Sequence, residues 1–297
     1  MATEARIHHY IPQAYLRGFG WQKGKNWYLH AADLKKHHYF QPNTKNICAE
    51  RDFMRFEMKG QSPDRLEKEM GTFEGKARQA LLHVAETRTF EGEDRTYVLN
   101  LMALLAVRSP QMRENMRDFQ ERVMKQVMSL TLATKERWEG QMEQLKAAGK
   151  AVNENVTYEE VKEFHERGEY KVNVRREFQI GSELKTHQTV LDTLAGRKWK
   201  LFYAGKDQGV FVTSDHPVVV SWNHFERIPP MMRRSPGFGM SDTEVIFPIT
   251  HNCCLLGRFE GGERRRGVHE PDRALQRAHH LARIRLCVHD RHSVPVH

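Results

Sequence analysis

Residues 244–259, EVIFPITHNCCLLGRF, decide the fold class of this chain. Two apolar runs, 244–250 and 253–259, flank the dipeptide His251-Asn252, and this pattern predicts an antiparallel β-hairpin. Upstream, residues 198–222 predict a strand, a GKDQG turn and a second strand that is broken at Asp215-His216-Pro217. The C-terminal half is therefore expected to contain mostly antiparallel strands.

The middle of the chain has the periodicity of helices instead. Ser62 and Pro63 are suited to cap and open a first helix, and Asp94 is expected to cap a second, nearly apolar one. Proline lacks the amide proton that a helix interior needs, so the second helix should stop or kink at 108–110, and a long amphipathic helix should follow. The first helix has one apolar face, made of Leu66, Met70, Phe73, Ala77, Leu81 and Val84.

Further helices are predicted on both sides of a polar stretch. A capping-box pattern at Thr157 opens a short helix that ends near Gly168, and another helix runs from Ser182 to Ala195. Residues 135–155 are polar and charged, and two interpretations remain open for them: an exposed helix end or a flexible linker.

Both ends of the chain complete the predicted fold. Residues 26–40 contain two aromatic-rich runs around 31–33 and predict a hairpin, which is too short to be stable alone and should pair with the C-terminal strands. A helix over 272–283 and a strand over 284–290 are expected last. The fold class is α+β in a single domain, 1–297, with 62–170 a helical subdomain or insertion packed to one side.

Composition limits the partners that we expect. Lys and Arg (47) outnumber Asp and Glu (38), and the net charge of +9 favours polyanionic partners such as nucleic acid. The sequence does not determine the oligomeric state. The longest apolar run, 98–107, is too short to span a bilayer, and no signal peptide is visible. None of the four cysteines has C-x-x-C spacing, which fits a protein of the reducing cytoplasm. Together with the short apolar run, this leads us to expect a cytoplasmic protein without a membrane partner.

The first candidate site lies in residues 8–19, HHYIPQAYLRGF. The spacing His9-x-x-Pro12 is similar to a local pattern of HNH nucleases, in which a histidine activates water beside a metal. Here His8 replaces the usual acid, and no zinc-knuckle cysteines follow. The alternative is structural: the aromatic residues pack a short turn onto the core, and the histidines are hydrogen-bonded near its start.

The second candidate is Asp215, in the polar break between apolar strands, where catalytic side chains are commonly presented. Ser214, Asp215 and His216 do not form a triad by adjacency, because neighbouring strand residues point to opposite faces. Asp215 could ligate a metal or orient a histidine. Alternatively, its carboxylate caps amides of the turn.

Arginines provide the remaining candidates. Arg108 ends the apolar helix, so its guanidinium needs an acidic partner, which Glu67 or Glu74 could supply. A structural ion pair and an anion-binding arginine in a cleft are the two interpretations. The basic run Arg264, Arg265 and Arg266 could bind phosphates of a nucleic acid, or could form a solvated face.

These motifs together resemble the bacterial domain-of-unknown-function family 4238, over nearly the whole chain. The family's elements are matched by HHYIPQAYLRGF (8–19), by Arg108, Pro110 and Arg113, by FVTSDHPV (211–218), and by Phe247-Pro248. The chain departs from the family pattern at Ala14, where a bulky aromatic is usual, and at His216, where asparagine is common. The resemblance implies landmarks rather than an activity.

The residues themselves suggest two functions. His8 or His9, Arg108 and Asp215 could line a polar cleft that hydrolyses a phosphodiester, with a divalent metal bound by Asp215 and His9. In the alternative, the chain is a non-catalytic module that binds nucleic acid or protein, and the same histidines and Asp215 are structural.

Overall fold

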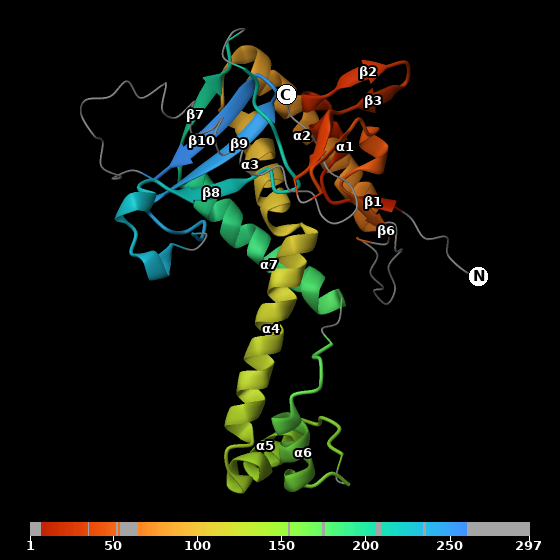
Figure 1. Cartoon of the computed structure of the whole chain (residues 1–297), viewed down its shortest axis with the longest axis vertical. Helices are drawn as coiled ribbons and strands as arrows, with labels where there is room; N and C mark the ends of the chain where they lie inside the picture. Colours follow the sequence, from red (N-terminus) through yellow and green to blue (C-terminus); the bar gives the residue numbers. More distant parts are fainter. Residues whose placement is uncertain are drawn as a thin grey trace. The chain divides into compact units, whose positions relative to one another are not determined.

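The computed structural model describes residues 7–34, 36–51, 53, 65–153, 155–173, 176–205, 209–233 and 236–259. The chain divides into two compact units, one formed by the described parts of 1–111 and 180–297, the other by those of 112–179 (Figure 1). The predicted helix 272–283, the predicted strand 284–290 and Arg264, Arg265 and Arg266 lie outside the described residues. The single-domain arrangement stays a prediction.

The first unit is built on a four-stranded antiparallel sheet in the order β7-β10-β9-β8. Its strands are β7 (Lys198–Tyr203), β8 (Val219–Trp222), β9 (Thr243–Thr250) and β10 (Cys253–Arg258). The β9–β10 hairpin around His251-Asn252 is confirmed, with Leu255 opposite Phe247. This hairpin is the centre of the sheet.

Residues 210–213 are not part of a strand, so the expected strand before the break is wrong. The Phe211 amide donates to the His251 carbonyl at 2.7 Å, outside the ladders of the sheet. The Phe211 ring is buried with Ile246, Cys254 and Leu256. Phe211 therefore packs against the sheet instead of pairing as part of a strand.

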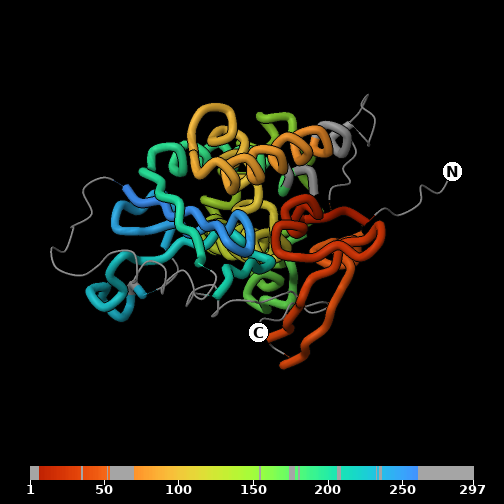
Figure 2. The backbone as a smooth tube through the Cα atoms, turned by 90° about the horizontal axis from the view of Figure 1, so that it is seen from above, coloured from red at the N-terminus to blue at the C-terminus, as the bar shows by residue number. Residues whose placement is uncertain are grey.

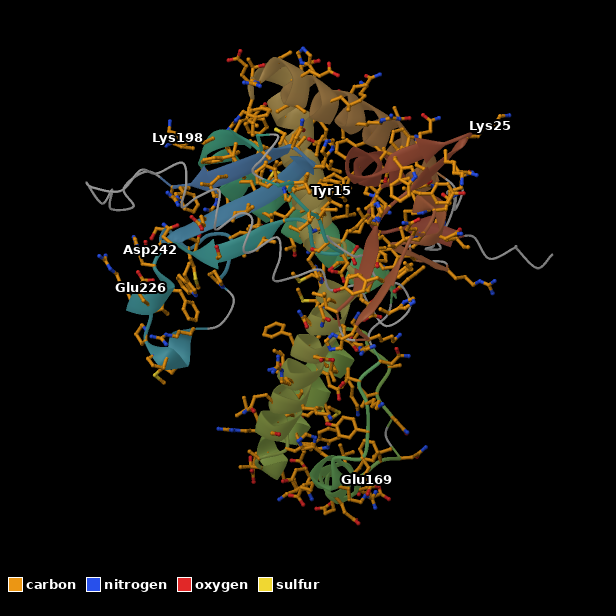
Figure 3. All side chains as sticks on the ribbon, turned by 45° about the horizontal axis from the view of Figure 1, so that its top comes forward. Tyr15, Lys25, Glu169, Lys198, Glu226 and Asp242 are labelled. Atoms are coloured by element: carbon orange, nitrogen blue, oxygen red, sulfur yellow. The ribbon has the colours of Figure 1, made fainter. Side chains whose placement is uncertain are left out.

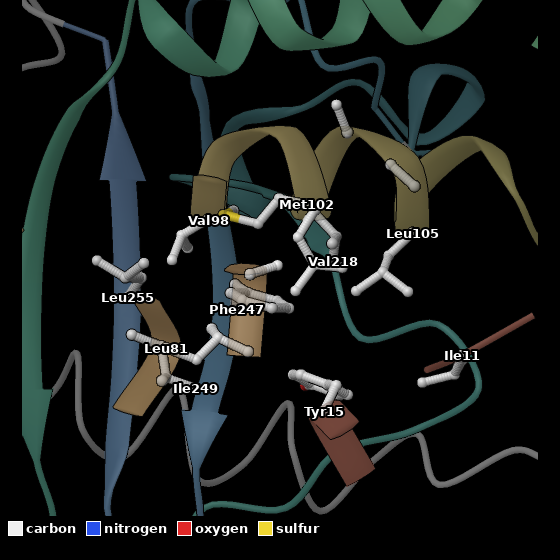
Figure 4. Close-up of a cluster of buried hydrophobic side chains, with 14 of the residues drawn as sticks. Ile11, Tyr15, Leu81, Val98, Met102, Leu105, Val218, Phe247, Ile249 and Leu255 are labelled. Atoms are coloured by element: carbon white, nitrogen blue, oxygen red, sulfur yellow. The ribbon is translucent and has the colours of Figure 1, made fainter. Parts of the chain in front are cut away.

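The central strands are buried on both faces, and their side chains alternate between two clusters. Val245, Phe247 and Leu255 belong to the main core, whereas Ile246 and Leu256 belong to the cluster beneath Phe211. Helices supply the rest of the main core, and Figure 4 shows Val98, Met102 and Leu105 above Phe247 and Leu255. The sequence therefore buries these strands on both sides.

Three helices of this unit are α2 (Arg65–Thr87), α3 (Gly92–Val107) and α7 (Arg176–Ala195), the last of which begins in the second unit. The stop before Pro110 is confirmed, because α3 ends at Val107. The cap at Asp94 is wrong, since the N-cap is Glu91. Asp94 instead contacts His83 on α2: the Asp94 Oδ2 lies 2.5 Å from the His83 Nδ1.

The N-terminal region folds into short elements of its own. These are β1 (Ile7–His9), α1 (Gln13–Leu16), β2 (Trp21–Lys23), β3 (Asn26–Tyr28), β4 (Ala31–Asp33), β5 (His38–Phe40) and β6 (Ala49–Arg51), with 3-10 turns at Arg17–Phe19 and Thr44–Asn46. They pair as β1-β6, β2-β3 and β4-β5, all antiparallel. The α+β class with antiparallel sheets is confirmed.

Two details of the expectation for this region are wrong. Residues 31–33 form a strand rather than a turn, and the hairpin does not join the C-terminal sheet among the described strands. The region attaches through the Gly18 carbonyl, which accepts from the His251 amide at 3.1 Å. A Cβ on Gly18 would lie 3.2 Å from the Ile249 carbonyl oxygen, so this close approach favours glycine.

The second unit is helical: α4 (Pro110–Thr131), which begins in the first unit, α5 (Lys135–Ala147) and α6 (Tyr158–Arg167). Residues 135–147 are thus helix rather than linker. The capping box at Thr157 is confirmed, and Gly168 ends α6 with a left-handed backbone, φ +68°. Within the described residues, none of the helices is long and apolar enough to cross a membrane.

Candidate functional site

Tyr15 on α1 connects the N-terminal motif to the two later motifs. Its hydroxyl donates to the Pro248 carbonyl at 2.8 Å and lies 2.7 Å from the Thr213 hydroxyl oxygen. Because the single phenolic proton is used on Pro248, Thr213 is the donor in the second bond. The ring also stacks on Phe247, with centroids 5.3 Å apart. Three segments distant in sequence therefore meet at one buried side chain.

His8 and His9 lie on β1, opposite Glu50 and Ala49 of β6. Burial lowers the pKa of His9 from its ordinary value of 6.5, and the charges of Arg108 and His8 lower it further, against the carbonyls of Thr44 and Lys45. Its Nε2 is buried and has no hydrogen-bond partner among the described residues. Burial therefore favours the neutral form of the ring.

Arg108 lies directly after α3 and is only 4% exposed. Its Nη2 donates to the His9 carbonyl oxygen at 2.7 Å, and its Nη1 is 3.7 Å from Glu74 Oε1 on α2. Burial raises the pKa of Glu74, and the arginine charge opposes that rise. Glu74, one of the two expected acidic partners, therefore lies beside Arg108, and the side chain of the other, Glu67, lies outside the described residues.

Asp215 lies in the segment before β8, beside Tyr10 and Cys48. Burial raises the pKa of both groups, that of the Cys48 thiol to about 12, and the Asp215 charge raises both further. The Tyr10 hydroxyl is hydrogen-bonded to the Cys48 sulfur. The Tyr10 amide also donates to the Cys48 carbonyl at 2.9 Å. Cys48 has a left-handed backbone, φ +55°, which is rare for a side chain of this kind.

The turn around Asp215 is closed by its neighbour. Ser214 Oγ accepts from the His216 amide at 3.1 Å, a short side-chain turn. Ser214 thus makes a capping contact of the kind that the sequence suggested for Asp215.

The predicted site residues come together only in part. His9 and Arg108 are in direct contact. The charge of Asp215 raises the pKa of Tyr10, the residue that follows His9. Among the described residues, no group of three or more His, Cys, Asp or Glu side chains is placed to hold a metal ion. Cys48 and its contact with Tyr10 were not predicted, because a lone cysteine carries no recognisable spacing.

The lowered pKa of His9 predicts a pH dependence of stability. Between pH 6.5 and the lower pKa of the folded state, the unfolded chain binds a proton at this ring that the folded chain does not. The free energy of unfolding should therefore fall more steeply below pH 6.5 in the wild type than in His9→Asn. Urea unfolding at a series of pH values measures the difference, and parallel curves for the two proteins would contradict it.

Comparison with known proteins gives one result at the level of families. Residues 7–287 match the family described as "Protein of unknown function (DUF4238)", which is nearly the whole of the chain. No curated protein and no solved structure matches it. The matched range contains all of the contacts described above, and the chain belongs to the DUF4238 family.

Proposed function

We propose that this chain is a non-catalytic module that binds nucleic acid, and that its His, Arg and Asp motifs hold the N-terminal region against the sheet. One observation carries the proposal: Arg108, 4% exposed, uses its guanidinium on the His9 carbonyl and Glu74. An arginine that stabilises a phosphoryl transition state must reach the substrate. This one is oriented toward the protein itself.

The surroundings of Asp215 support the same proposal. The raised pKa values of the Tyr10 hydroxyl and the Cys48 thiol mean that both groups stay protonated and neutral near pH 7. Neutral groups buried next to the Asp215 charge are part of the packed interior. The net charge of +9 is the reason for expecting nucleic acid as the partner.

A second function, phosphodiester hydrolysis, is favoured by His9. Its lowered pKa favours a neutral imidazole, the form of histidine that acts as a general base. In this scheme Asp215 would orient a histidine or bind a divalent metal, and Arg108 would stabilise charge on the phosphoryl oxygens.

The two functions differ in what His9→Ala and Asp215→Asn should change. For a binding module, the wild type binds labelled DNA or RNA without cleaving it, with or without Mg²⁺ or Mn²⁺, and both variants melt several degrees lower. For a hydrolase, the wild type cleaves, and both variants lose about 10²–10⁴-fold in rate at an unchanged melting temperature. His83→Ala and Asp118→Asn, at exposed side chains, serve as matched controls.

Cleavage by the wild type that is abolished in the variants would overturn the proposal in favour of the hydrolase. Absence of binding to any DNA or RNA at low salt would refute both the binding function and the hydrolase. The melting temperatures of the two variants would still decide whether the motifs stabilise the fold.

A further inference from the structure

The N-terminal region carries positive charge with almost no negative charge to balance it. Between Arg17 and Cys48 the only carboxylate is Asp33. Asp33 is 4% exposed; its Oδ1 accepts from the Lys36 amide at 2.9 Å, and its Oδ2 is 3.7 Å from Lys36 Nζ. The basic residues of this stretch are Arg17, Lys23, Lys25, Lys35, Lys36 and Lys45. Its net charge is therefore strongly positive.

The β2–β3 hairpin places aromatic rings beside this charge. Trp21 pairs with Tyr28, and Lys23 with Asn26, so these four side chains share one face of the hairpin. The Trp21 and Tyr28 rings stack with centroids 6.2 Å apart, and His30 packs 4.5 Å from the Trp21 ring. Figure 2 shows the hairpins of this region extending from its body, and Figure 3 labels Lys25 at a tip.

The lysines of this surface are available to a ligand. Lys23, Lys25 and Lys45 are exposed, and none of them has a carboxylate partner among the described residues. Lys45 lies next to the hairpin, because Tyr28 bridges to Asn43 and the Leu29 amide donates to the Pro42 carbonyl at 3.1 Å. Lys23 thus shares a face with Trp21 and Tyr28, and Lys45 follows the segment that pairs with Tyr28.

The β4–β5 hairpin adds a further exposed ring. Tyr39 is 63% exposed although its strand partner Ala32 is buried. On the other face of β5, His38 stacks on Phe40, with centroids 5.3 Å apart. An exposed tyrosine ring offers a flat surface for a base to stack upon.

We propose that the β2–β3 and β4–β5 hairpins together bind single-stranded nucleic acid, with Lys23, Lys25 and Lys45 contacting phosphates and Tyr39 stacking on a base. The inference rests on the proposed function and names its partner and its site. Single strands are favoured over duplexes because exposed rings can stack only on bases that are not already stacked within a helix.

The test uses fluorescence anisotropy with the full chain, a labelled single-stranded RNA of mixed sequence, the same strand as DNA, and the RNA duplex. The variants are Lys23→Ala/Lys25→Ala and Tyr39→Ala; the control is Lys135→Ala/Lys150→Ala, at exposed lysines of the second unit. Melting curves verify that each variant is folded.

We expect the wild type to bind single strands more tightly than the duplex. Tyr39→Ala should weaken this binding roughly 5- to 150-fold, as the removal of one stacking ring does. Lys23→Ala/Lys25→Ala should reduce the slope of log K against log salt by about 0.7 for each phosphate that the variant no longer neutralises. The lysine control should bind as the wild type does.

Each other outcome overturns part of the proposal. Unchanged binding in both hairpin variants would reject this surface and leave the proposed function standing. Tighter binding to the duplex would reject the single-stranded partner. If no nucleic acid binds, the proposed function fails as well. Binding to phosphatidylserine vesicles in place of nucleic acid, abolished in Lys23→Ala/Lys25→Ala, would reassign the surface to membranes.

Discussion

Replacing Arg108 by methionine should lower the free energy of unfolding by about 3–5 kcal/mol, the usual cost of removing one partner of a buried ion pair. The methionine fills much of the space but leaves the Glu74 carboxylate without its cation and the His9 carbonyl without its donor. Because the arginine is 4% exposed, water does not replace its hydrogen bond to the His9 carbonyl. The N-terminal region should then detach first.

Thermal and urea unfolding measure this effect. For domains of this size each kcal/mol shifts the melting temperature by about 2–4 °C. Arg117→Met is the matched control, since the Arg117–Glu114 pair at 3.0 Å is about half exposed and should contribute under about 1 kcal/mol. An Arg108→Met protein as stable as this control would show that the guanidinium does not hold the N-terminal region.

Replacing Tyr15 by alanine should cost a similar amount, about 3–5 kcal/mol, because it removes a large buried ring stacked on Phe247. Tyr15→Phe keeps the ring and removes only the hydroxyl. The Pro248 carbonyl then loses its donor and Thr213 its acceptor, so we expect the free energy of unfolding to fall by about 1–3 kcal/mol.

The two substitutions divide the contribution of Tyr15 into packing and hydrogen bonding, and urea unfolding measures both. Tyr39→Ala is the control: its ring is 63% exposed, and the change in stability should stay within about 0.5 kcal/mol. A Tyr15→Phe protein with wild-type stability would mean that the hydroxyl bonds to the later motifs contribute nothing to the fold.

The β9–β10 hairpin could be predicted because its information is local: two apolar runs lie on either side of a turn dipeptide. The N-terminal strands could not, because each is three residues long and too short to show an alternation of apolar and polar residues. The predicted pairing with the C-terminal sheet failed for a related reason. Single hydrogen bonds such as that between His251 and Gly18 attach the region without extending the sheet.

The candidate site was predictable where burial alone demands a partner. An arginine at the end of an apolar helix needs a carboxylate, and a carboxylate on the preceding helix supplies it. The hydrogen bond between Tyr15 and Thr213 joins residues 198 positions apart, and no local pattern encodes it. Resemblance to a family supplied these landmarks, but only the folded chain brings them into contact.

The measurement that tests the central claim most directly is a double-mutant cycle between Tyr15→Phe and Thr213→Val, read by urea unfolding. If the N-terminal motif and the 211–218 motif stabilise each other, the effects of the two substitutions are not additive, and the coupling energy is about 0.5–3 kcal/mol. Effects that add to within about 0.3–0.5 kcal/mol would show that the motifs do not act on each other, and would contradict the structural role assigned to them.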